Sequence, residues 1–407
     1  MVETTPATRE VTVRPAAPGD APATSRLAQR VFSSTVRDEP GPAGRPEVDG
    51  PPPPLKVVAD HDGQVVAVAS AALRGQWFGG RRTLCAAVGG VAVGVEARGL
   101  GVGGAVMRSL LTAAHEAGAT TSTLFPSTHA FYTGLGYGIG GRRPVHALAT
   151  AELRALAGRR PRGLGLRRAA PADAAAVAGL VRRRAARGNG LLDHSGADER
   201  VVEDPTDTES YVVELDGAVR GWCTLGRRPP STRDAWYDLV VRDLVADTPE
   251  VELDLWRMVV GDHPSALRAE AVVMPGSIME GIDSHQEVVE DAGWMMRLLD
   301  VDAALADRGY PPGVAADLVL QVEDPVCPWN DGTRVLSVSD GSARVRPAPD
   351  AAPDAVVSAS DLASLFTAHL DPLEARRQGR LRSADEDTAR VLRGLFAGPP
   401  AWLARTF

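Results

Sequence analysis

Cysteine is scarce in this sequence. The 407 residues include only Cys85, Cys223 and Cys327, which are odd in number and far apart. They form no CxxC pair, so the pattern predicts neither a structural zinc site nor a disulfide framework. The histidines show no metal-ligand spacing, and we expect no metal. Such a chain suits a reducing compartment, and we expect it to be cytoplasmic.

Long apolar runs and an excess of basic residues are also absent. No apolar stretch approaches the roughly 20 residues that span a bilayer, and the first residues do not resemble a signal peptide. We therefore expect no membrane span. Asp and Glu total 52 against 44 Lys and Arg, a formal net charge of −8. Nucleic-acid-binding proteins usually carry a basic excess, so we expect no nucleic-acid partner.

Apolar residues are plentiful and are organised as a repeat. They make up 44% of the chain, whose length exceeds one ordinary domain. The segment VTVRPAAPGDAPA, which starts at Val11, is echoed by LGLRRAAPADAAA, which starts at Leu164. An apolar hairpin follows each segment, at 55–73 and at 211–225. The pattern predicts two copies of one α/β unit.

The pattern changes after residue 298. Strand-like pieces, turns and a helix with one apolar face predict a third, small α+β domain there. We therefore predict an α/β multidomain chain with domains at 1–150, 151–297 and 298–407. A glycine-rich turn is present in the first unit and missing from the second, so we expect a ligand only in the first.

The glycine-rich turn lies in VAVGVEARGLGVGG, from Val91 to Gly104. It begins as a strand and enters a helix that has a regular apolar face and ends near Gly118. Such a turn presents backbone N–H groups at the positive end of a helix dipole, which suits a pyrophosphate. Two alternatives stay open. Gly99, Gly101 and Gly104 fit the dinucleotide pattern GxGxxG, although no acidic residue follows at the expected distance, and the turn could bind no ligand.

A second motif follows the glycine-rich turn. A short apolar strand is stopped by Pro126, and a short helix containing Phe131-Tyr132 ends at Gly136-Tyr137. With these residues in place, the sequence resembles the GNAT acetyltransferase superfamily. The letters RGLGVG, at 98–103, match its R/Q-x-x-G-x-G/A pyrophosphate loop, and Phe131 to Tyr137 match its FY…GY/F segment.

The order of units along the whole chain narrows the resemblance. An acetyltransferase unit, a degenerate copy and a C-terminal domain similar to sterol carrier proteins resemble the enhanced intracellular survival (Eis) family. The segment MRLLDVDAAL, from Met296, and a C-terminal Phe are further matches. The resemblance implies tandem GNAT folds, the second degenerate, plus a sterol-carrier-protein-like domain. It also implies acetyl transfer from acetyl-CoA to primary amines, including aminoglycosides and lysine side chains, and assembly as a homohexamer.

The resemblance also implies the cofactor-binding residues. Val91, Ala92 and Val93 would hold the pantetheine arm, and Ser127 and Thr128 would contact the cofactor beyond the next strand. The pyrophosphate would be bound by Arg98, Gly99, Leu100, Gly101, Val102, Gly103 and Gly104. Some relatives have more Arg in this loop, so we expect a weaker electrostatic grip on the phosphates here.

Two proton-transfer groups are implied in the same way. Tyr132 falls on the general acid, and the α-carboxylate of Phe407 falls on the general base. A Tyr hydroxyl, with an ordinary pKa of about 10, suits a departing thiol, and an α-carboxyl, with a pKa of about 3.3–3.7, is ionised at pH 7. The last residues, PPAWLARTF, are apolar and stiffened by proline, which favours docking over fraying. From the residues alone, Tyr132 as a core aromatic and Phe407 as a packing residue stay open.

Other functions also stay open. The chain could be a lipid- or protein-binding protein that uses the third domain beside a vestigial acetyltransferase part, or an enzyme for a longer acyl chain. The expected partner is a small-molecule or peptide amine acceptor, whose pocket would need acidic residues. Asp20, Asp38 and Glu39 lie in the right region, although acids at the surface are the ordinary case.

Overall fold

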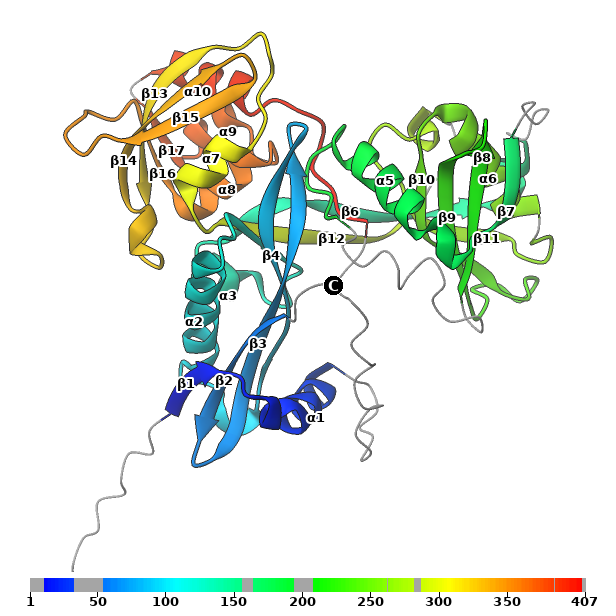
Figure 1. Ribbon diagram of the computed structural model, residues 1–407, viewed down its shortest axis with the longest axis horizontal. Coiled ribbons are helices and arrows are strands. Elements are labelled where there is room, and N and C mark those ends of the chain that lie inside the picture. Colours follow the sequence, from blue (N-terminus) through cyan, green and yellow to red (C-terminus); the bar gives the residue numbers. More distant parts are fainter. Residues whose placement is uncertain are drawn as a thin grey trace, which may run out of the picture.

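The chain folds as three units (Figure 1). The computed structural model describes residues 11–32, 54–155, 164–193, 208–261, 263–281, 287–383 and 385–404. Two α/β units share one 12-stranded sheet, and the third is built on a five-stranded sheet. The expected mixed α/β class is confirmed, whereas the domain boundaries at 150 and 297 stay predictions. Within the described ranges, none of the helices has both the length and the apolar character that crossing a bilayer requires.

The first unit is an antiparallel meander followed by a strand–helix–strand crossover. Its elements are β1 (Val11–Pro15), η1 (Pro18–Asp20), α1 (Ala21–Phe32), β2 (Leu55–His61), β3 (Gln64–Phe78), β4 (Arg81–Val93), η2 (Val95–Ala97), α2 (Val102–Glu116), β5 (Thr121–Leu124), α3 (His129–Thr133) and β6 (Gly138–Ala149). Asp62 and Gly63 adopt positive φ, 54° and 75°, as a tight hairpin turn between β2 and β3 requires. The first expected hairpin is therefore confirmed.

Helix α2 covers one face of this sheet. Its buried residues are Val102, Val106, Met107, Leu110, Leu111 and Ala114, and they form the apolar face that the sequence predicts. Burial of each large aliphatic side chain contributes about 1.5–3 kcal/mol. The helix ends just before Gly118, which has a φ of 82°. The packing of α2 therefore fixes the position of the glycine-rich turn at its other end.

The second unit repeats the order of the first. Its elements are α4 (Thr150–Ala155), β7 (Leu164–Arg168), η3 (Pro171–Asp173), α5 (Ala174–Ala185), β8 (Thr208–Leu215), β9 (Ala218–Arg228), β10 (Asp238–Ala246), α6 (Pro249–Gly261), β11 (Arg268–Val272), η5 (Ile278–Gly281) and β12 (Glu287–Leu298). One ion pair recurs at the same place in both units. Arg14 contacts Asp20 at 2.6 Å in the first, and Arg167 contacts Asp173 at 2.7 Å in the second. The repeat expected from the sequence is therefore present in the fold.

The two units exchange their last strands. In the sheet, β12 of the second unit lies between β5 and β6 of the first, and Met295–Leu298 pair with β5. Strand β6 of the first unit lies between β12 and β11, and its residues Val145–Ala149 pair with β11 of the second. The first unit is therefore completed by a strand that lies far away in the sequence.

The third unit packs on β12. Its elements are α7 (Val301–Asp307), β13 (Ala316–Glu323), η6 (Pro328–Asn330), β14 (Gly332–Ser339), β15 (Ser342–Pro347), β16 (Ala355–Ser358), α8 (Ala359–Phe366), α9 (Pro372–Arg377), β17 (Leu381–Ser383) and α10 (Glu386–Leu395). Successive residues of a strand face opposite sides. Accordingly, Trp294, Met296 and Leu298 belong to the core of the third unit, and Met295 belongs to the core of the first.

Candidate active site

The parallel strands β4 and β5 pair over a short length and then separate. Residues Cys85–Ala87 pair with Thr121–Thr123, and β5 ends one residue later. Strand β4 continues to Val93 and is paired there only with β3. Within the described chain, the other edge of β4, from Val88 to Val93, therefore presents backbone N–H and C=O groups to no strand. The predicted pantetheine residues Val91 to Val93 lie on this edge.

A bulge accompanies the separation. Val68 pairs with Ala92 and Ser70 pairs with Gly89, so β4 has one more residue than β3 in this interval. Gly90 adopts a φ of 63°, and the Ser70 hydroxyl donates to the Gly89 carbonyl at 2.8 Å. A β-bulge bends its strand and increases the local twist. The bulge therefore accounts for the local change in the course of β4 where it is no longer paired with β5.

The glycine-rich turn leads from β4 into α2. Gly99 and Gly101 have φ of 81° and 74°, and a Cβ on either would find no atom within 4 Å. The backbone conformation, rather than crowding, therefore requires glycine. Gly101 is the N-cap of α2, where no side chain caps the helix and no acid lies in the first turn. The turn therefore presents uncapped N–H groups at the positive end of a helix of 15 residues, an arrangement that binds anionic groups such as a diphosphate.

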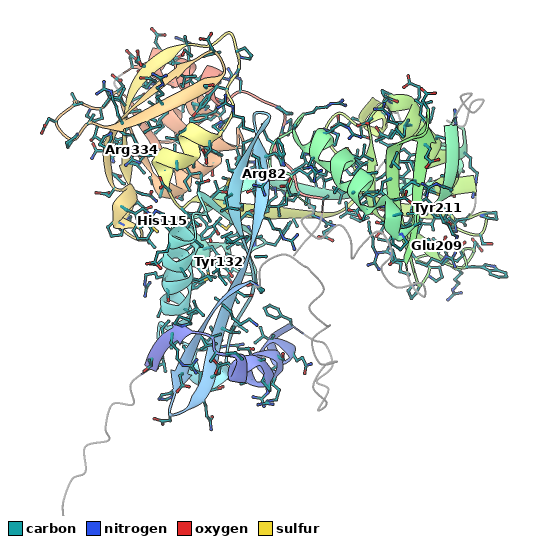
Figure 2. The ribbon with its side chains drawn as sticks, in the orientation of Figure 1. Arg82, His115, Tyr132, Glu209, Tyr211 and Arg334 are labelled. Atoms are coloured by element: carbon teal, nitrogen blue, oxygen red, sulfur yellow. The ribbon has the colours of Figure 1, made fainter. Side chains whose placement is uncertain are left out.

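Tyr132 lies on α3 and is nearly buried, with 6% of its surface exposed. Its ring contacts Phe131 and Tyr137 edge-on, and Figure 2 shows it between α2 and the β3–β4 hairpin. Burial raises the pKa of Tyr132 above its ordinary value. No hydrogen bond joins its hydroxyl to another described residue, whereas the Tyr137 hydroxyl is 2.7 Å from Ser122 Oγ. The Tyr132 phenol is therefore protonated at neutral pH, and its hydroxyl has no hydrogen-bond partner among the described residues.

A buried ion pair holds the turn that follows Tyr132. Arg297 of β12 donates to the Leu135 carbonyl and lies 2.5 Å from Asp324, and both charged side chains are fully buried. Burial alone would raise the pKa of Asp324, but attraction to Arg297, together with hydrogen bonds from Arg297, Cys327 N and Asn330, lowers the pKa. Gly136, with a φ of 81°, leaves the space that the guanidinium occupies. The third unit is thus tied to the segment that carries Tyr132.

Sequence reasoning missed this ion pair. An Arg inside the apolar run WMMRLL signals a buried charge that must be paired. The partner, Asp324, lies beyond the next strand, and nothing in a single sequence distinguishes it from other acids.

The chain's last described segment docks at the centre of the molecule. Ala401, Trp402 and Leu403 are buried, and Trp402 N donates to the Asn189 carbonyl at 3.1 Å. Arg143 Nε donates to the Ala404 carbonyl at 3.2 Å. Docking of this apolar, proline-stiffened end agrees with the sequence-based expectation. Phe407, the predicted base, lies outside the described residues.

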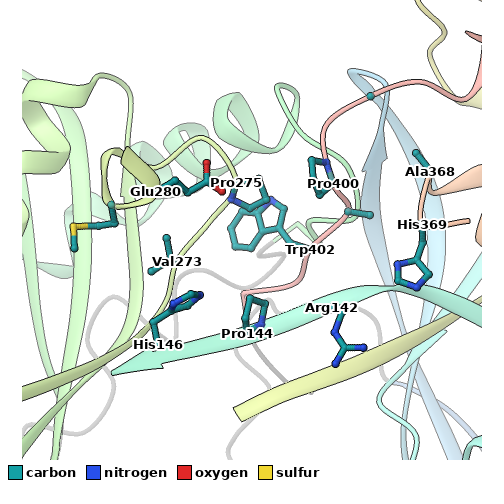
Figure 3. A pocket seen from close by; sticks show the side chains of 13 residues that line it. Arg142, Pro144, His146, Val273, Pro275, Glu280, Ala368, His369, Pro400 and Trp402 are labelled. Atoms are coloured by element: carbon teal, nitrogen blue, oxygen red, sulfur yellow. The ribbon is translucent and has the colours of Figure 1, made fainter. Parts of the chain in front are cut away.

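A cavity of about 710 Å³ lies beside this segment, and Figure 3 shows the side chains that line it. The side chains of Arg142, Pro144 and His146 line it from β6, and Trp402 and Pro400 line it from the C-terminal segment. A molecule bound in this cavity would contact the segment that precedes Phe407.

The second unit has a different turn at the place of the glycine loop. Strand β10 ends at Ala246, and α6 begins at Pro249 with Glu250 and Glu252 in its first turn. Acids at this position oppose anion binding, because they lie at the positive end of the helix themselves. The expected loss of the glycine turn is therefore observed.

The structure describes some of the remaining predicted residues, and others lie outside the described ranges. Ser127 and Thr128 are exposed, between β5 and α3. Asp20 is bound to Arg14, which lowers its pKa to about 2. Because Asp173 repeats this contact, Asp20 is explained by the fold without an acceptor; Asp38 and Glu39 lie outside the described residues. Among the described side chains, no group of three or more His, Cys, Asp and Glu could hold a metal ion.

Comparison with known proteins finds two domain models that match parts of this chain. The acetyltransferase (GNAT) domain model matches residues 12–140, and the sterol carrier protein domain model matches residues 301–404. Residues 12–140 form a GNAT acetyltransferase domain. An uncharacterized N-acetyltransferase of Streptomyces avermitilis is 27% identical over 367 residues, which cover 86% of this chain and 88% of the relative. Another, from Streptomyces coelicolor, is 28% identical over 317 residues, which cover 75% and 76%.

Solved structures share the fold beyond the GNAT domain. A GCN5-related N-acetyltransferase from Kribbella flavida has a TM-score of 0.83 at 27% identity and covers 99% of this chain and 100% of its own. Eis1 from Mycobacterium abscessus has a TM-score of 0.76 at 22% identity and covers 98% and 100%, which shows a common fold. With its GNAT domain and these N-acetyltransferase relatives, the chain is an acetyltransferase. The interpretation of a binding protein with a vestigial acetyltransferase part is therefore not favoured.

Proposed function

We propose that the chain transfers an acetyl group from acetyl-CoA to a primary amine, with Tyr132 as general acid and the α-carboxylate of Phe407 as general base. GNAT acetyltransferases use acetyl-CoA. The observation that carries the proposal is the uncapped glycine turn at the start of α2, next to the unpaired edge of β4. Tyr132, whose hydroxyl is bonded to none of the described residues, lies in the same unit's core.

Each part of the cofactor is assigned to a part of this site. The backbone of Val91 to Val93 would hold the amide groups of the pantetheine arm, because that edge of β4 pairs with no described strand. The turn from Arg98 to Gly104 would bind the diphosphate. Ser127 and Thr128, exposed just before α3, would contact the cofactor from the other side.

The reaction needs two proton transfers. The amine nitrogen attacks the thioester carbonyl carbon, so that a C–N bond forms and the C–S bond breaks. The Phe407 carboxylate takes the amine proton, directly or through water, and the Tyr132 hydroxyl gives its proton to the departing thiolate. The two groups then exchange protons with solvent, and no further reactant is needed.

The finer assignment is also a proposal. Resemblance to the Eis family favours aminoglycosides and lysine side chains as acceptors, a homohexamer and a cytoplasmic location. The likeness of fold to Eis1 and the sterol carrier domain match support this assignment. The domain limits 1–150, 151–297 and 298–407 belong to the same proposal.

An acceptor panel tests the proposed function. Acetyl-CoA is incubated with the protein and, in turn, with aminoglycosides, polyamines and lysine peptides, and the products are identified by mass spectrometry. We expect release of CoA together with an acceptor that has gained one acetyl group. Release of CoA with no acetylated amine in any class, or no release at all, would contradict the proposal.

A further inference from the structure

The second unit contains a groove built like the proposed pantetheine groove of the GNAT domain. Strands β10 and β11 are parallel and pair only over Leu239–Val241 and Ala269–Ala271. The next residues of β10, Arg242–Val245, line a residual cavity of about 20 Å³ together with Val272 and Met274. A space of that size holds about one water molecule. The groove is therefore present in the second unit but nearly full.

The C-terminal segment fills this groove. Trp402 and Ala404 line the residual cavity from the other side. The Trp402 ring is 5% exposed and shares a core cluster with Val245 of β10, Met274 after β11 and Val181 of α5. A tryptophan buries about 150–250 Å² in such contacts. The side chain thus lies where an equivalent cofactor arm would run in this copy of the fold.

Polar contacts fix the backbone around Trp402. Asn189 is 1% exposed and donates through Nδ2 to the Pro399 carbonyl at 2.9 Å. The backbone carbonyl of Asn189 accepts a hydrogen bond from Trp402 N. Its Oδ1 accepts from Gly79 N at 2.8 Å, at the tip of the β3–β4 hairpin. The contact of Arg143 with the Ala404 carbonyl completes the set. The segment is therefore anchored to the first and second units together.

The charges at the start of α6 differ from those at the glycine turn. The carboxylate of Asp247, which follows β10, lies 2.9 Å from Arg183 and 3.4 Å from Arg220. With Glu250 and Glu252 at the start of α6, acids occupy the place where the GNAT domain presents bare N–H groups. With acids in its first turn, this helix start favours a diphosphate less than the glycine turn does, and the groove beside it holds the uncharged Trp402 side chain.

We propose that the second unit's former cofactor groove binds the chain's own C-terminal segment and thereby positions Phe407 at the active site of the GNAT domain. Trp402 is then a positioning residue, and the degenerate copy has a role in catalysis. Three residues follow Ala404, and three residues span at most about 10 Å, so anchoring the segment limits where the terminal carboxylate can lie. This inference rests on the proposed role of that carboxylate as the base.

A mutant cycle tests the inference. Trp402→Leu and Trp402→Phe are each made in the native chain and in a chain extended by one glycine after Phe407. We measure kcat at saturating acetyl-CoA and acceptor, the Kd of acetyl-CoA by calorimetry, and Tm. In the native chain we expect Trp402→Leu to lower kcat by about 10- to 100-fold, since a small misplacement of a catalytic group has an effect of that size, with Kd unchanged. In the extended chain, neither substitution should lower kcat further.

The possible outcomes separate the two claims. An unchanged kcat for Trp402→Leu, beside a collapsed kcat in the extended chain, would overturn this inference and leave the proposed base intact. If Trp402→Leu lowers kcat in the extended chain by the same factor as in the native chain, the inference is also overturned, because Trp402 would then act independently of the terminal carboxylate. If the glycine extension alone leaves kcat unchanged, the proposed base is wrong and the inference fails with it. If Trp402→Leu does not fold, Trp402→Phe decides the question. A loss of kcat that is smaller than the loss expected for Trp402→Leu, and that is seen in the native chain but not in the extended chain, supports the inference. An unchanged kcat for Trp402→Phe in the native chain overturns it.

Discussion

Replacing Tyr132 with phenylalanine is expected to lower kcat by about 10²- to 10⁴-fold, the usual contribution of a positioned general acid. The substitution removes one oxygen from a ring that is otherwise held by packing against Phe131 and Tyr137. No described residue loses a hydrogen bond. We therefore expect the Tm and the Kd of acetyl-CoA to stay near those of the native chain. Steady-state kinetics, calorimetry and thermal unfolding check these three values.

The control is Tyr137→Phe, which removes the neighbouring hydroxyl and its hydrogen bond to Ser122. It should lower Tm, because a hydrogen bond of this kind contributes about 0.5–1.5 kcal/mol to the free energy of unfolding. Its kcat should stay close to that of the native chain. An equal kcat for native chain and Tyr132→Phe would exclude the phenol from the mechanism.

The pH profile gives an independent check on Tyr132. Burial raises the pKa of Tyr132, whose ordinary value is about 10. The phenol therefore remains able to donate a proton throughout the neutral range and loses this ability only as the pH rises through its raised pKa. In the kcat profile, the alkaline limb that belongs to this group is expected above pH ~10 and should be missing from Tyr132→Phe. A limb near neutral pH that Tyr132→Phe abolishes would contradict the assignment.

Adding one glycine after Phe407 is expected to reduce kcat by a similar factor, about 10²- to 10⁴-fold. The extension moves the α-carboxylate along the chain without removing any side chain. The docked segment from Ala401 to Ala404 should remain in place, since its burial and its contact with Arg143 do not involve the terminus. Affinity for acetyl-CoA is expected to be unchanged. Single-turnover kinetics and calorimetry measure the two quantities separately.

A glycine added at the other end of the chain is the control for this extension, and it should leave kcat unaltered. If the C-terminal extension has the same kcat as this control, the base is another group. Loss of acetyl-CoA affinity along with kcat would instead mean that the terminus contributes to cofactor binding.

Local sequence patterns predicted the parts of the site that are built locally. The glycine-rich turn before α2 and the buried face of α2 follow from glycine chemistry and helical periodicity, which neighbouring residues determine. The hairpin turn at Asp62-Gly63 follows for the same reason. Where a feature depends on a few adjacent residues, a single sequence is sufficient.

Long-range pairing could not be predicted in this way. A single sequence contains no information that β6 and β12 cross between the two units. The Arg297–Asp324 ion pair and the buried position of Trp402 beside Asn189 likewise depend on residues that come into contact only in the folded chain. The ion pair of Asp20 with Arg14, which the second unit repeats, was likewise not predicted.

Calorimetric titration of coenzyme A into three proteins tests the central claim most directly. They are the native chain, Gly101→Ala and Gly118→Ala. The two glycines lie at opposite ends of α2 with φ of 74° and 82° and open space around them, so each substitution introduces a similar strain of about 1–2 kcal/mol. Only Gly101 belongs to the turn that is proposed to bind the diphosphate. The account predicts a Kd about tenfold or more weaker for Gly101→Ala, a loss of about 1.4 kcal/mol or more, and a native Kd for Gly118→Ala. Equal affinity in all three proteins, or no binding by the native chain, would contradict it.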